Sequence, residues 1–395
     1  MAEEISYVIT TPYTLAKSRT GGILSRLLSR VDLELIAAQI ITPDETTVQA
    51  YADSFTAFSN PEKPGSAELL RDYVLNNMLP SEGRAHRAAL FLFRGENAVS
   101  QLMDTVGAMY PENRSIESLN GETIRDTYAD LLRDADGQVS YFEPAVLTPH
   151  SAKEAAANLR IFAKFMHGQD NVVQNLKYDN PSAIQRTLVI LKPDNWRVPS
   201  TRPGSIIDML SRTGLRVVGT KIYQMSTADA LEFYGAVKGA LEKKLAPKAA
   251  DNAVELLERE FDLVLDENAR KGINDSFGVA YAHYQFGGIV EFMSGRRPEE
   301  VPFEEMDRPG TVKSMVLVYE GENAIEKIRK VLGPTDPRQA PGGTVRRDFG
   351  SDVMVNAVHA SDSPESATRE CGIVRINEND FSRLVERYLD GGLTN

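Results

Sequence analysis

Residues 356–367, NAVHASDSPESA, place His359 beside Asn356 and directly before a Ser-Asp-Ser-Pro sequence, in a chain with only five histidines. A histidine can serve as a nucleophile or a proton carrier near neutral pH, because its imidazole ring titrates there. A lone histidine at the end of a strand is more commonly structural. The residues around His359, and the elements that position them, therefore decide between the two roles.

The chain contains four sequence blocks that occur twice in the same order. Each pair shares the same succession of apolar strand, loop and helix residues, and Gly-Glu-Asn-Ala recurs unchanged after a strand in the second pair. The pairs are 7–40 with 188–222, ALFLFRGENAVSQL with MVLVYEGENAIEKI, GETIRDTY with GGTVRRDF, and PAVLTPHSAKEA with NAVHASDSPESA. Four collinear matches predict two copies of one domain.

We place the first copy at residues 1–165, a polar linker at 166–184 and the second copy at 185–395. The linker contains Asn180-Pro181, a pair that favours a turn over a continuing helix. A length of 395 residues fits this division, because single cores rarely grow beyond 250–300 residues.

Each copy reads as strand, helix, strand, helices, strand, helix, strand. This order predicts an α+β fold of two ferredoxin-like βαββαβ domains, each an antiparallel four-stranded sheet with helices packed on it as an α/β sandwich. Ser363 and Pro364 form a typical helix start, which puts His359 where a strand leads into a helix. In the second copy we expect strands at 187–191, 215–225, 314–319 and 353–358, and helices at 204–213 and 323–331.

The composition bounds the class of protein. The formal net charge of −12 argues against a protein that coats nucleic acid, which needs surplus Lys and Arg. The single cysteine, Cys371, excludes an internal disulfide or a Cys-ligated zinc site and fits a reducing compartment. No apolar segment is long enough to span a bilayer, and the N-terminus lacks the pattern of a signal peptide. We expect a cytoplasmic protein that binds neither nucleic acid nor membrane.

The second copy resembles the nucleoside diphosphate kinases. The resemblance rests on RTLVILKPD, GENAIEKIRKVLGPTDP, PGGTVRRDFG and NAVHASDSPESA, which follow that family's order and cover most of 185–376 apart from two inserts. It implies a ping-pong reaction in which a nucleoside triphosphate donates its γ-phosphoryl group to a histidine, which passes it to a nucleoside diphosphate. Phosphoryl transfer of this kind needs a nucleophile in line and several cationic or hydroxyl donors around the phosphates.

By this resemblance, three residues carry the catalysis. His359 matches the nucleophile, Glu370 matches the carboxylate that orients the imidazole from its other nitrogen, and Lys192 matches the lysine near the γ-phosphate and the ribose. Without the resemblance, we would expect Glu370 to be a solvent-exposed helix residue and Lys192 to be an exposed residue at the end of a strand. The Lys-Pro-Asp that follows an apolar run favours a functional Lys192.

The resemblance also implies a nucleotide-binding set. Its arginines suit phosphate oxygens because the guanidinium presents two parallel donors. Tyr234 could instead be a tyrosine of the hydrophobic core, and core packing explains Phe286 and Ile289 as well as base contact does. Arg347 stands where the family usually has Gly, and we expect its side chain to face solvent. The set comprises Arg329, Thr335 and Arg346 for phosphates, Asn356 for the sugar hydroxyl, Tyr234 near the phosphates, and Phe286 and Ile289 against the base.

The sequence has no Walker-type phosphate loop, since GGTVRRDFG lacks the Lys-Ser/Thr ending. The resemblance therefore implies Mg²⁺ as a cofactor that arrives with the nucleotide phosphates, with no dedicated protein metal site. This suits an ion that keeps most of its waters and binds few protein groups.

The first copy lacks the reactive residues. Alignment puts Thr11 at the lysine position, Met103 at the first arginine, Pro144 at the asparagine and Leu147 at the histidine, while Arg125 alone is retained, opposite Arg346. We expect this copy to be inactive. It could serve as a built-in partner in an intramolecular pseudo-dimer, since family members assemble through sheet edges and helices, and a homo-oligomer is also possible.

Two inserts depart from the family pattern. Residues 236–283 replace a short helical hairpin and carry a rough apolar stripe, which predicts one or two extra helices for packing or as a lid. Residues 296–311 read as a proline-containing loop. The inserts leave open a catalytically silent nucleotide sensor or scaffold, and transfer from His359 to proteins is a third possibility. The leading hypothesis is a nucleoside diphosphate kinase with one working site per chain.

Overall fold

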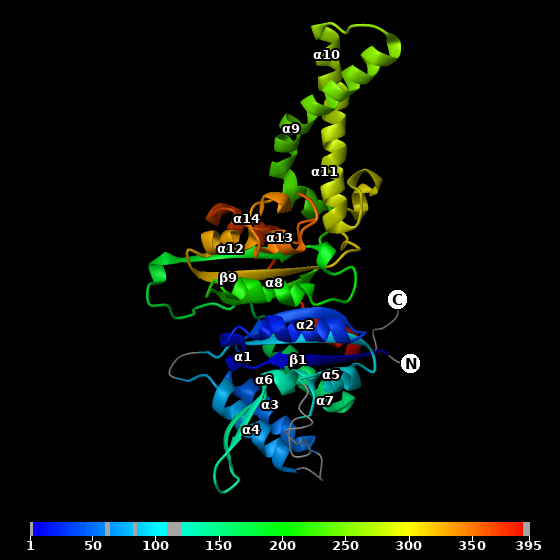
Figure 1. Ribbon diagram of the computed structural model, residues 1–395. Coiled ribbons are helices and arrows are strands. Elements are labelled where there is room, and N and C mark those ends of the chain that lie inside the picture. Colours follow the sequence, from blue (N-terminus) through cyan, green and yellow to red (C-terminus); the bar gives the residue numbers. More distant parts are fainter. Residues whose placement is uncertain (1–2, 60–63, 82–84, 109–120, 390–395) are drawn as a thin grey trace. The chain divides into compact units, whose positions relative to one another are not determined.

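The computed structural model describes residues 3–59, 64–81, 85–108 and 121–389, so the first two residues of the acidic N-terminus lie outside it (Figure 1). The chain forms two compact units. The sheet unit comprises residues 1–222, 315–371 and 375–395, and the helical unit comprises 223–314 with 372–374.

The first sheet has the strand order β2-β3-β1-β6, with β1 antiparallel to both β3 and β6 and β2 antiparallel to β3. Alternate residues of β1 enter different cores, as the pleat of a strand requires: Tyr7 and Ile9 pack on one face and Val8 on the other. The strands are β1 (Glu3–Thr10), β2 (Glu34–Ile41), β3 (Ala88–Glu96) and β6 (Val146–Leu147).

The second sheet has the order β10-β7-β9-β8, with β7 antiparallel to β9 and β10. Counted within its own half of the chain, each sheet places its strands in the same order. The predicted α+β class with antiparallel sheets is confirmed. The strands are β7 (Ile184–Leu191), β8 (Arg216–Tyr223), β9 (Ser314–Glu322) and β10 (Val358–Ala360).

The prediction of a strand at 353–358 is wrong. Residues 353–355 are all apolar, as in a buried strand, but the Asp352 carboxylate accepts hydrogen bonds from the backbone N–H groups of Met354 and Val355 and folds the segment into turns. The strand is only three residues long, and His359 is its central residue.

Helices cover both faces of the first sheet. Two further strands, β4 (Asp130–Arg133) and β5 (Val139–Glu143), pair as a separate hairpin. The helices are α1 (Pro12–Ala16), α2 (Thr20–Arg30), α3 (Glu45–Ala57), α4 (Pro64–Met78), α5 (Ala98–Val106), α6 (Ile124–Tyr128) and α7 (Ala152–Met166).

In the second half, the helix predicted at Ser363-Pro364 begins there, and the Ser363 hydroxyl accepts a hydrogen bond of 3.0 Å from the Ser366 N–H. Short 3₁₀ turns precede β7, follow β7 and follow α12, at Pro181–Ala183, Pro193–Asn195 and Pro337–Gln339. The helices are α8 (Arg202–Ser211), α12 (Ala324–Leu332), α13 (Val345–Phe349), α14 (Pro364–Ile373) and α15 (Phe381–Leu389).

The last helix, α15, packs against α7 of the first half. Phe381 and Val385 enter the core that the first sheet forms with α3, α4 and α7, and the Ser382 hydroxyl donates a hydrogen bond of 2.6 Å to the Ala163 carbonyl. The C-terminus therefore completes the core of the first half.

The two halves also meet through α2 and α8. A Cβ on Gly21 would lie 2.6 Å from the Gly204 carbonyl oxygen, and one on Gly204 would lie 2.3 Å from the Gly21 oxygen. The Ser25 hydroxyl donates a hydrogen bond of 3.0 Å to the Thr201 carbonyl. The backbones of the two helices approach so closely because neither glycine has a side chain.

Unusual backbone conformations recur at matching places in the two halves. Four pairs of residues have left-handed or positive φ angles that agree within 10°. A non-glycine residue in this region is uncommon, so the recurrence at an alanine pair is informative. The pairs are Gly95 and Gly321 (156° and 156°), Asn97 and Asn323 (52° and 54°), Gly107 and Gly333 (88° and 78°), and Ala145 and Ala357 (62° and 68°).

The helical unit contains the first insert. α9 and α11 pack side by side, and α10 lies at the far end of the pair (Figure 1). A capping box at Ser226 and Asp229 begins α9. Its elements are α9 (Thr227–Phe261), α10 (Glu267–Ile273), a π-helical turn (Asn274–Gly278), α11 (Val279–Ser294) and 3₁₀ turns at Pro298–Glu300 and Phe303–Glu305.

Candidate functional site

His359 lies on β10 and contacts the helix that follows it. Its Nε2 atom lies 2.9 Å from Oε2 of Glu370 on α14. The imidazole is 22% exposed, whereas the Glu370 side chain is 5% exposed. The predicted partnership of these two residues therefore has hydrogen-bonding geometry, with the carboxylate buried and the ring accessible.

Glu370 is itself held in place from two sides. The Ser361 hydroxyl donates a hydrogen bond of 2.8 Å to Oε2, and the Arg369 guanidinium lies 3.4 Å from Oε1. Ser361 is not among the residues predicted for the site. Ser361 could have been predicted from its spacing, because it lies two residues after His359 and alternate residues of an extended segment point to the same side.

Lys192, at the end of β7, is buried against the turn that precedes β10. Its Nζ atom donates hydrogen bonds to Oδ1 of Asn356 over 2.7 Å and to the Met354 carbonyl over 3.1 Å. Burial, together with the positive charge of Arg346, lowers the pKa of Lys192 from its usual 10.5 to about 8. A bound phosphate would supply the negative charge that favours the protonated form.

Asn356 ties the lysine to a second loop. Its Nδ2 donates to the Thr335 carbonyl over 3.1 Å and to the Val353 carbonyl over 3.0 Å. The structure thus brings Lys192 and Asn356, two of the residues predicted to bind nucleotide, together with the loop that contains Thr335.

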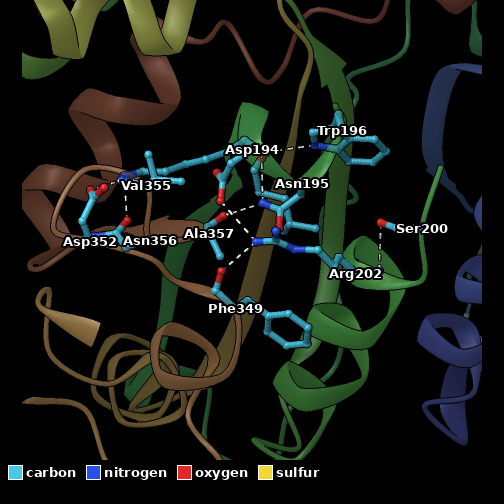
Figure 2. A network of polar contacts seen from close by, with 12 residues as sticks. Asp194, Asn195, Trp196, Ser200, Arg202, Phe349, Asp352, Val355, Asn356 and Ala357 are labelled. Carbon is cyan, nitrogen blue, oxygen red and sulfur yellow. Dashed lines mark hydrogen bonds and ion pairs between the residues drawn. The ribbon is translucent and has the colours of Figure 1, made fainter. Parts of the chain in front are cut away.

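A polar network fixes the segment that follows Lys192 (Figure 2). The Asn195 side-chain amide donates a hydrogen bond of 2.7 Å to the carbonyl of Ala357. Ala357 has a left-handed φ of 68°, which turns the chain between Asn356 and β10. Asp194 lies 3.3 Å from the Arg202 guanidinium, which also donates to the Phe349 carbonyl over 2.7 Å. Burial raises the pKa of Asp194, and the charge of Arg202 opposes that rise.

Arg346 donates to two backbone carbonyls, those of Gly333 at 2.9 Å and Val358 at 3.2 Å. Arg125 does the same in the first half, with the Gly107 carbonyl at 2.6 Å and the Val146 carbonyl at 3.1 Å. These bonds join the end of a helix to the last strand of each sheet. They give Arg125 a structural role in the first half, where Thr11 and Leu147 stand at the positions aligned with Lys192 and His359.

Arg329 and Thr335 have exposed side chains at the end of α12 and in the loop after it. The pKa of the Asp362 carboxyl is lowered by a hydrogen bond from Ser366 and, to a smaller extent, by the charges of Arg329 and His359. Arg347 is exposed, as predicted.

Tyr234, Phe286 and Ile289 belong to the helical unit. Tyr234 on α9 and Phe286 on α11 are buried within that unit, and Ile289 is half-buried. Their roles in nucleotide binding stay predictions, and the rival account of core packing stays open.

The corresponding region of the first half holds a different buried cluster. Thr11 stands at the position aligned with Lys192, and its hydroxyl donates a hydrogen bond of 2.7 Å to the Glu143 carboxylate. The same carboxylate accepts a hydrogen bond of 2.6 Å from the Tyr73 hydroxyl. Burial raises the pKa of Glu143. Leu147, at the histidine position, is fully buried.

The described ranges contain no group of three or more His, Cys, Asp or Glu side chains that could hold a metal ion. Within the same ranges, the helices are all too short or too polar to cross a bilayer. Three other histidines have polar neighbours: His86 contacts Ser81, His150 contacts Glu154, and His283 contacts Glu242.

Comparison with known proteins identifies the family. The family model "Nucleoside diphosphate kinase" matches residues 303–379, which include six of the predicted site residues. The chain is 33% identical over 188 residues to a nucleoside diphosphate kinase of Halorhodospira halophila, across 48% of this chain and 90% of the relative. A nucleoside diphosphate kinase of a Brugia malayi Wolbachia is 35% identical over 188 residues, across 48% of this chain and 91% of the relative.

A crystal structure of an NDP kinase from Pyrobaculum aerophilum is 27% identical and covers 48% of this chain and 94% of that chain, with a TM-score of 0.32. The fold described above does not rest on that superposition. The sequence relatives suffice: the chain belongs to the nucleoside diphosphate kinase family of enzymes.

Proposed function

We propose that this enzyme transfers the γ-phosphoryl group of a nucleoside triphosphate to a nucleoside diphosphate through phospho-His359. The hydrogen bond between His359 Nε2 and Glu370 carries the proposal. When the Nε2 proton is donated to the carboxylate, the lone pair of a neutral imidazole resides on Nδ1, and Nδ1 is then the nucleophile.

In the first half-reaction, Nδ1 attacks the γ-phosphorus, a P–N bond forms, and the bond to the bridging oxygen breaks with release of the nucleoside diphosphate. Glu370 stabilises the positive charge that develops on the ring. In the second half-reaction, the terminal phosphate oxygen of another nucleoside diphosphate attacks the phosphohistidine and restores the free imidazole.

Lys192, Arg329, Thr335 and Arg346 are proposed to neutralise the phosphates, and Asn356 to contact the ribose. The lowered pKa of Lys192 supports this role, since a negatively charged phosphate beside this buried amine would favour its protonated form. Mg²⁺, bound to the nucleotide phosphates, would offset their charge, and the exposed carboxylate of Asp362 is an oxygen ligand of the type this ion prefers.

Tyr234 is proposed to reach the phosphates, and Phe286 with Ile289 to contact the base. Such contacts would bind different bases alike, because an apolar surface forms no base-specific hydrogen bonds. This would allow donor and acceptor nucleotides to share one site.

We propose further that the chain is a tandem duplication, with a degenerate domain at 1–165, a linker at 166–184 and a catalytic domain at 185–395 that carries inserts at about 236–283 and 296–311. The four pairs of matching φ angles support this, as does the identical pairing of Arg125 and Arg346 with two carbonyls. Thr11 and Leu147 in place of Lys192 and His359 support an inactive first copy.

The two copies are proposed to form an intramolecular pseudo-dimer through α2 and α8. The close approach at Gly21 and Gly204 supports this arrangement, as does the packing of α15 on α7. A cytoplasmic location is also proposed, on the basis of the single cysteine.

The experiment is a steady-state assay of γ-phosphoryl transfer from ATP to GDP with varied concentrations of both. A ping-pong enzyme gives parallel double-reciprocal lines, and His359→Gln should abolish transfer. Intersecting lines, or an active His359→Gln variant, would show direct transfer between nucleotides and refute the phosphohistidine.

A further inference from the structure

A cavity of about 270 Å³ lies between the two halves of the sheet unit, away from the residues assigned to His359 chemistry. The first half contributes Ile40 and Phe91, and the second half contributes Met315, Leu317 and Tyr319. These side chains also belong to, or border, the hydrophobic core between the two sheets.

This cavity opens to solvent, because the exposed residues Ala16, Ser18 and Arg216 belong to its lining. Most of the surface that lines it is apolar. An apolar cavity has few partners for water and is a favourable site for an apolar group of matching size. The lining therefore suits a small ring or branched aliphatic body.

A second pocket, of about 590 Å³, adjoins the first and is polar. The two share Leu15, Ala16, Arg87 and Arg216, so the arginines stand where the apolar cavity meets the polar one. The polar pocket is also lined by Lys177, with Asp179 as its one acidic side chain. A basic pocket is a local exception in a chain with a net charge of −12.

The two arginines are held by backbone and aromatic contacts. Arg87 donates to the Val217 carbonyl, while Arg216 donates 2.8 Å to the Lys177 carbonyl and lies 4.5 Å from the centre of the Tyr178 ring. In the described part of the chain, neither guanidinium forms an ion pair with a carboxylate. Burial lowers the pKa of Arg87, and the charge of Arg216 lowers it further.

The nearby carboxylate of Glu320 is already ion-paired with Arg186, and its charge only partly offsets the effect of burial on the pKa of Arg87. Two neighbouring guanidiniums at the mouth of an apolar cavity thus offer bidentate donors to an anionic oxygen group.

We propose that this cavity binds a small amphipathic organic anion, with an apolar ring or branched body between the two sheets and a carboxylate, sulfonate or phosphate head on Arg87 and Arg216. The site is separate from the proposed nucleotide site. Because both halves line it, its occupant would stabilise their association by mass action.

The test is isothermal titration of the full-length protein with naphthalene-1-sulfonate, in the presence and absence of saturating ADP. We expect saturable binding of one probe per chain that ADP does not displace. Two control probes should each bind at least about tenfold more weakly. Naphthalene-1-methanol lacks the anionic head and loses the charge-assisted hydrogen bonds, whereas inorganic phosphate lacks the apolar body and loses its burial.

Two variants locate the probe. Arg216→Gln removes an exposed charge from the mouth, and Ala16→Phe fills the passage shared by both pockets; each should weaken binding at least about tenfold. Ala16→Ser is the matched control and should bind normally. Phosphoryl transfer by all three variants verifies their folding. Absent binding, displacement by ADP, or wild-type affinity in Arg216→Gln and Ala16→Phe would each overturn the proposal.

Discussion

Nζ of Lys192 donates a hydrogen bond of 2.7 Å to Oδ1 of Asn356, and this pair joins the end of β7 to the turn before β10. At the matching place in the first half stand Thr11 and Pro144, and the Thr11 hydroxyl donates to Glu143 instead. The same backbone frame therefore supports a cationic site in one half and a buried acid in the other.

Nucleotide affinity should fall as the pH rises through the pKa of Lys192, which is about 8. Deprotonation removes the positive charge that the phosphates require, so the Kd for ADP should rise about tenfold between about pH 7 and about pH 9. Lys192→Arg should flatten this dependence, because arginine stays protonated throughout. Titrations of both proteins across this range test the assignment, and an unchanged slope in Lys192→Arg would contradict it.

The same pKa predicts a change in stability without nucleotide. Because the pKa of Lys192 is lower in the folded protein than in the unfolded chain, the unfolded chain binds more protons between about pH 8 and 10.5. This residue therefore makes the free energy of unfolding rise with pH across that window. Denaturant unfolding of Lys192→Gln should lack this contribution, whereas an identical pH dependence in both proteins would argue against a buried, pKa-shifted lysine.

Glu370→Gln should lower kcat by about 10-fold to 100-fold, the usual cost of losing a group that orients a reactive histidine. The amide no longer stabilises the developing positive charge on His359. Ser361→Ala is the matched control: it removes a donor to Glu370 but leaves its charge, so its effect should be smaller. Pre-steady-state rates of His359 phosphorylation would measure both, and equal rates in Glu370→Gln and wild type would exclude the orienting role.

Arg125 and Arg346 form a natural control pair. Each variant to Gln removes hydrogen bonds to two carbonyls and should lower the free energy of unfolding by about 1–3 kcal/mol. Only Arg346→Gln should also raise the KM for nucleotides, since Arg346 is proposed to bind phosphate. If the two variants keep equal KM values at a temperature where both are folded, Arg346 is structural only.

Gly204→Ala should separate α2 from α8. The new Cβ would lie 2.3 Å from backbone atoms of α2, and such overpacking costs about 1–3 kcal/mol of folding free energy. Gly239→Ala on α9, where nothing lies within 4 Å of the new Cβ, should gain about 0.5–1 kcal/mol. Thermal unfolding distinguishes them, and a Gly204→Ala protein as stable as wild type would rule out a tight contact between the two halves.

The motifs predicted to carry the chemistry lie at the ends of elements. The apolar run before Lys192 predicts the strand that ends at Leu191, and Ser363-Pro364 predicts the helix that begins shortly after His359. These features depend on local sequence patterns, which a single chain displays directly.

Other features depend on contacts that no local pattern encodes. An arginine that donates to two carbonyls, as Arg346 does, has the same sequence signal as one that binds phosphate. The amphipathic pattern of α15 indicates a buried face but not that its partner is α7. The apolar residues 353–355 imitate a strand, and the turn formed by Asp352 overrides that pattern.

The most direct test of the account is the intact mass of the protein after incubation with ATP and Mg²⁺, kept at alkaline pH because phosphohistidine is labile in acid. Phosphoryl transfer through His359 predicts one added phosphoryl group per chain, its removal by GDP, and its absence in His359→Ala. Because the first half has Leu147 at the histidine position, a second phosphoryl group is not expected. A protein that binds ATP without any added mass would contradict the phosphohistidine and favour a nucleotide sensor or scaffold.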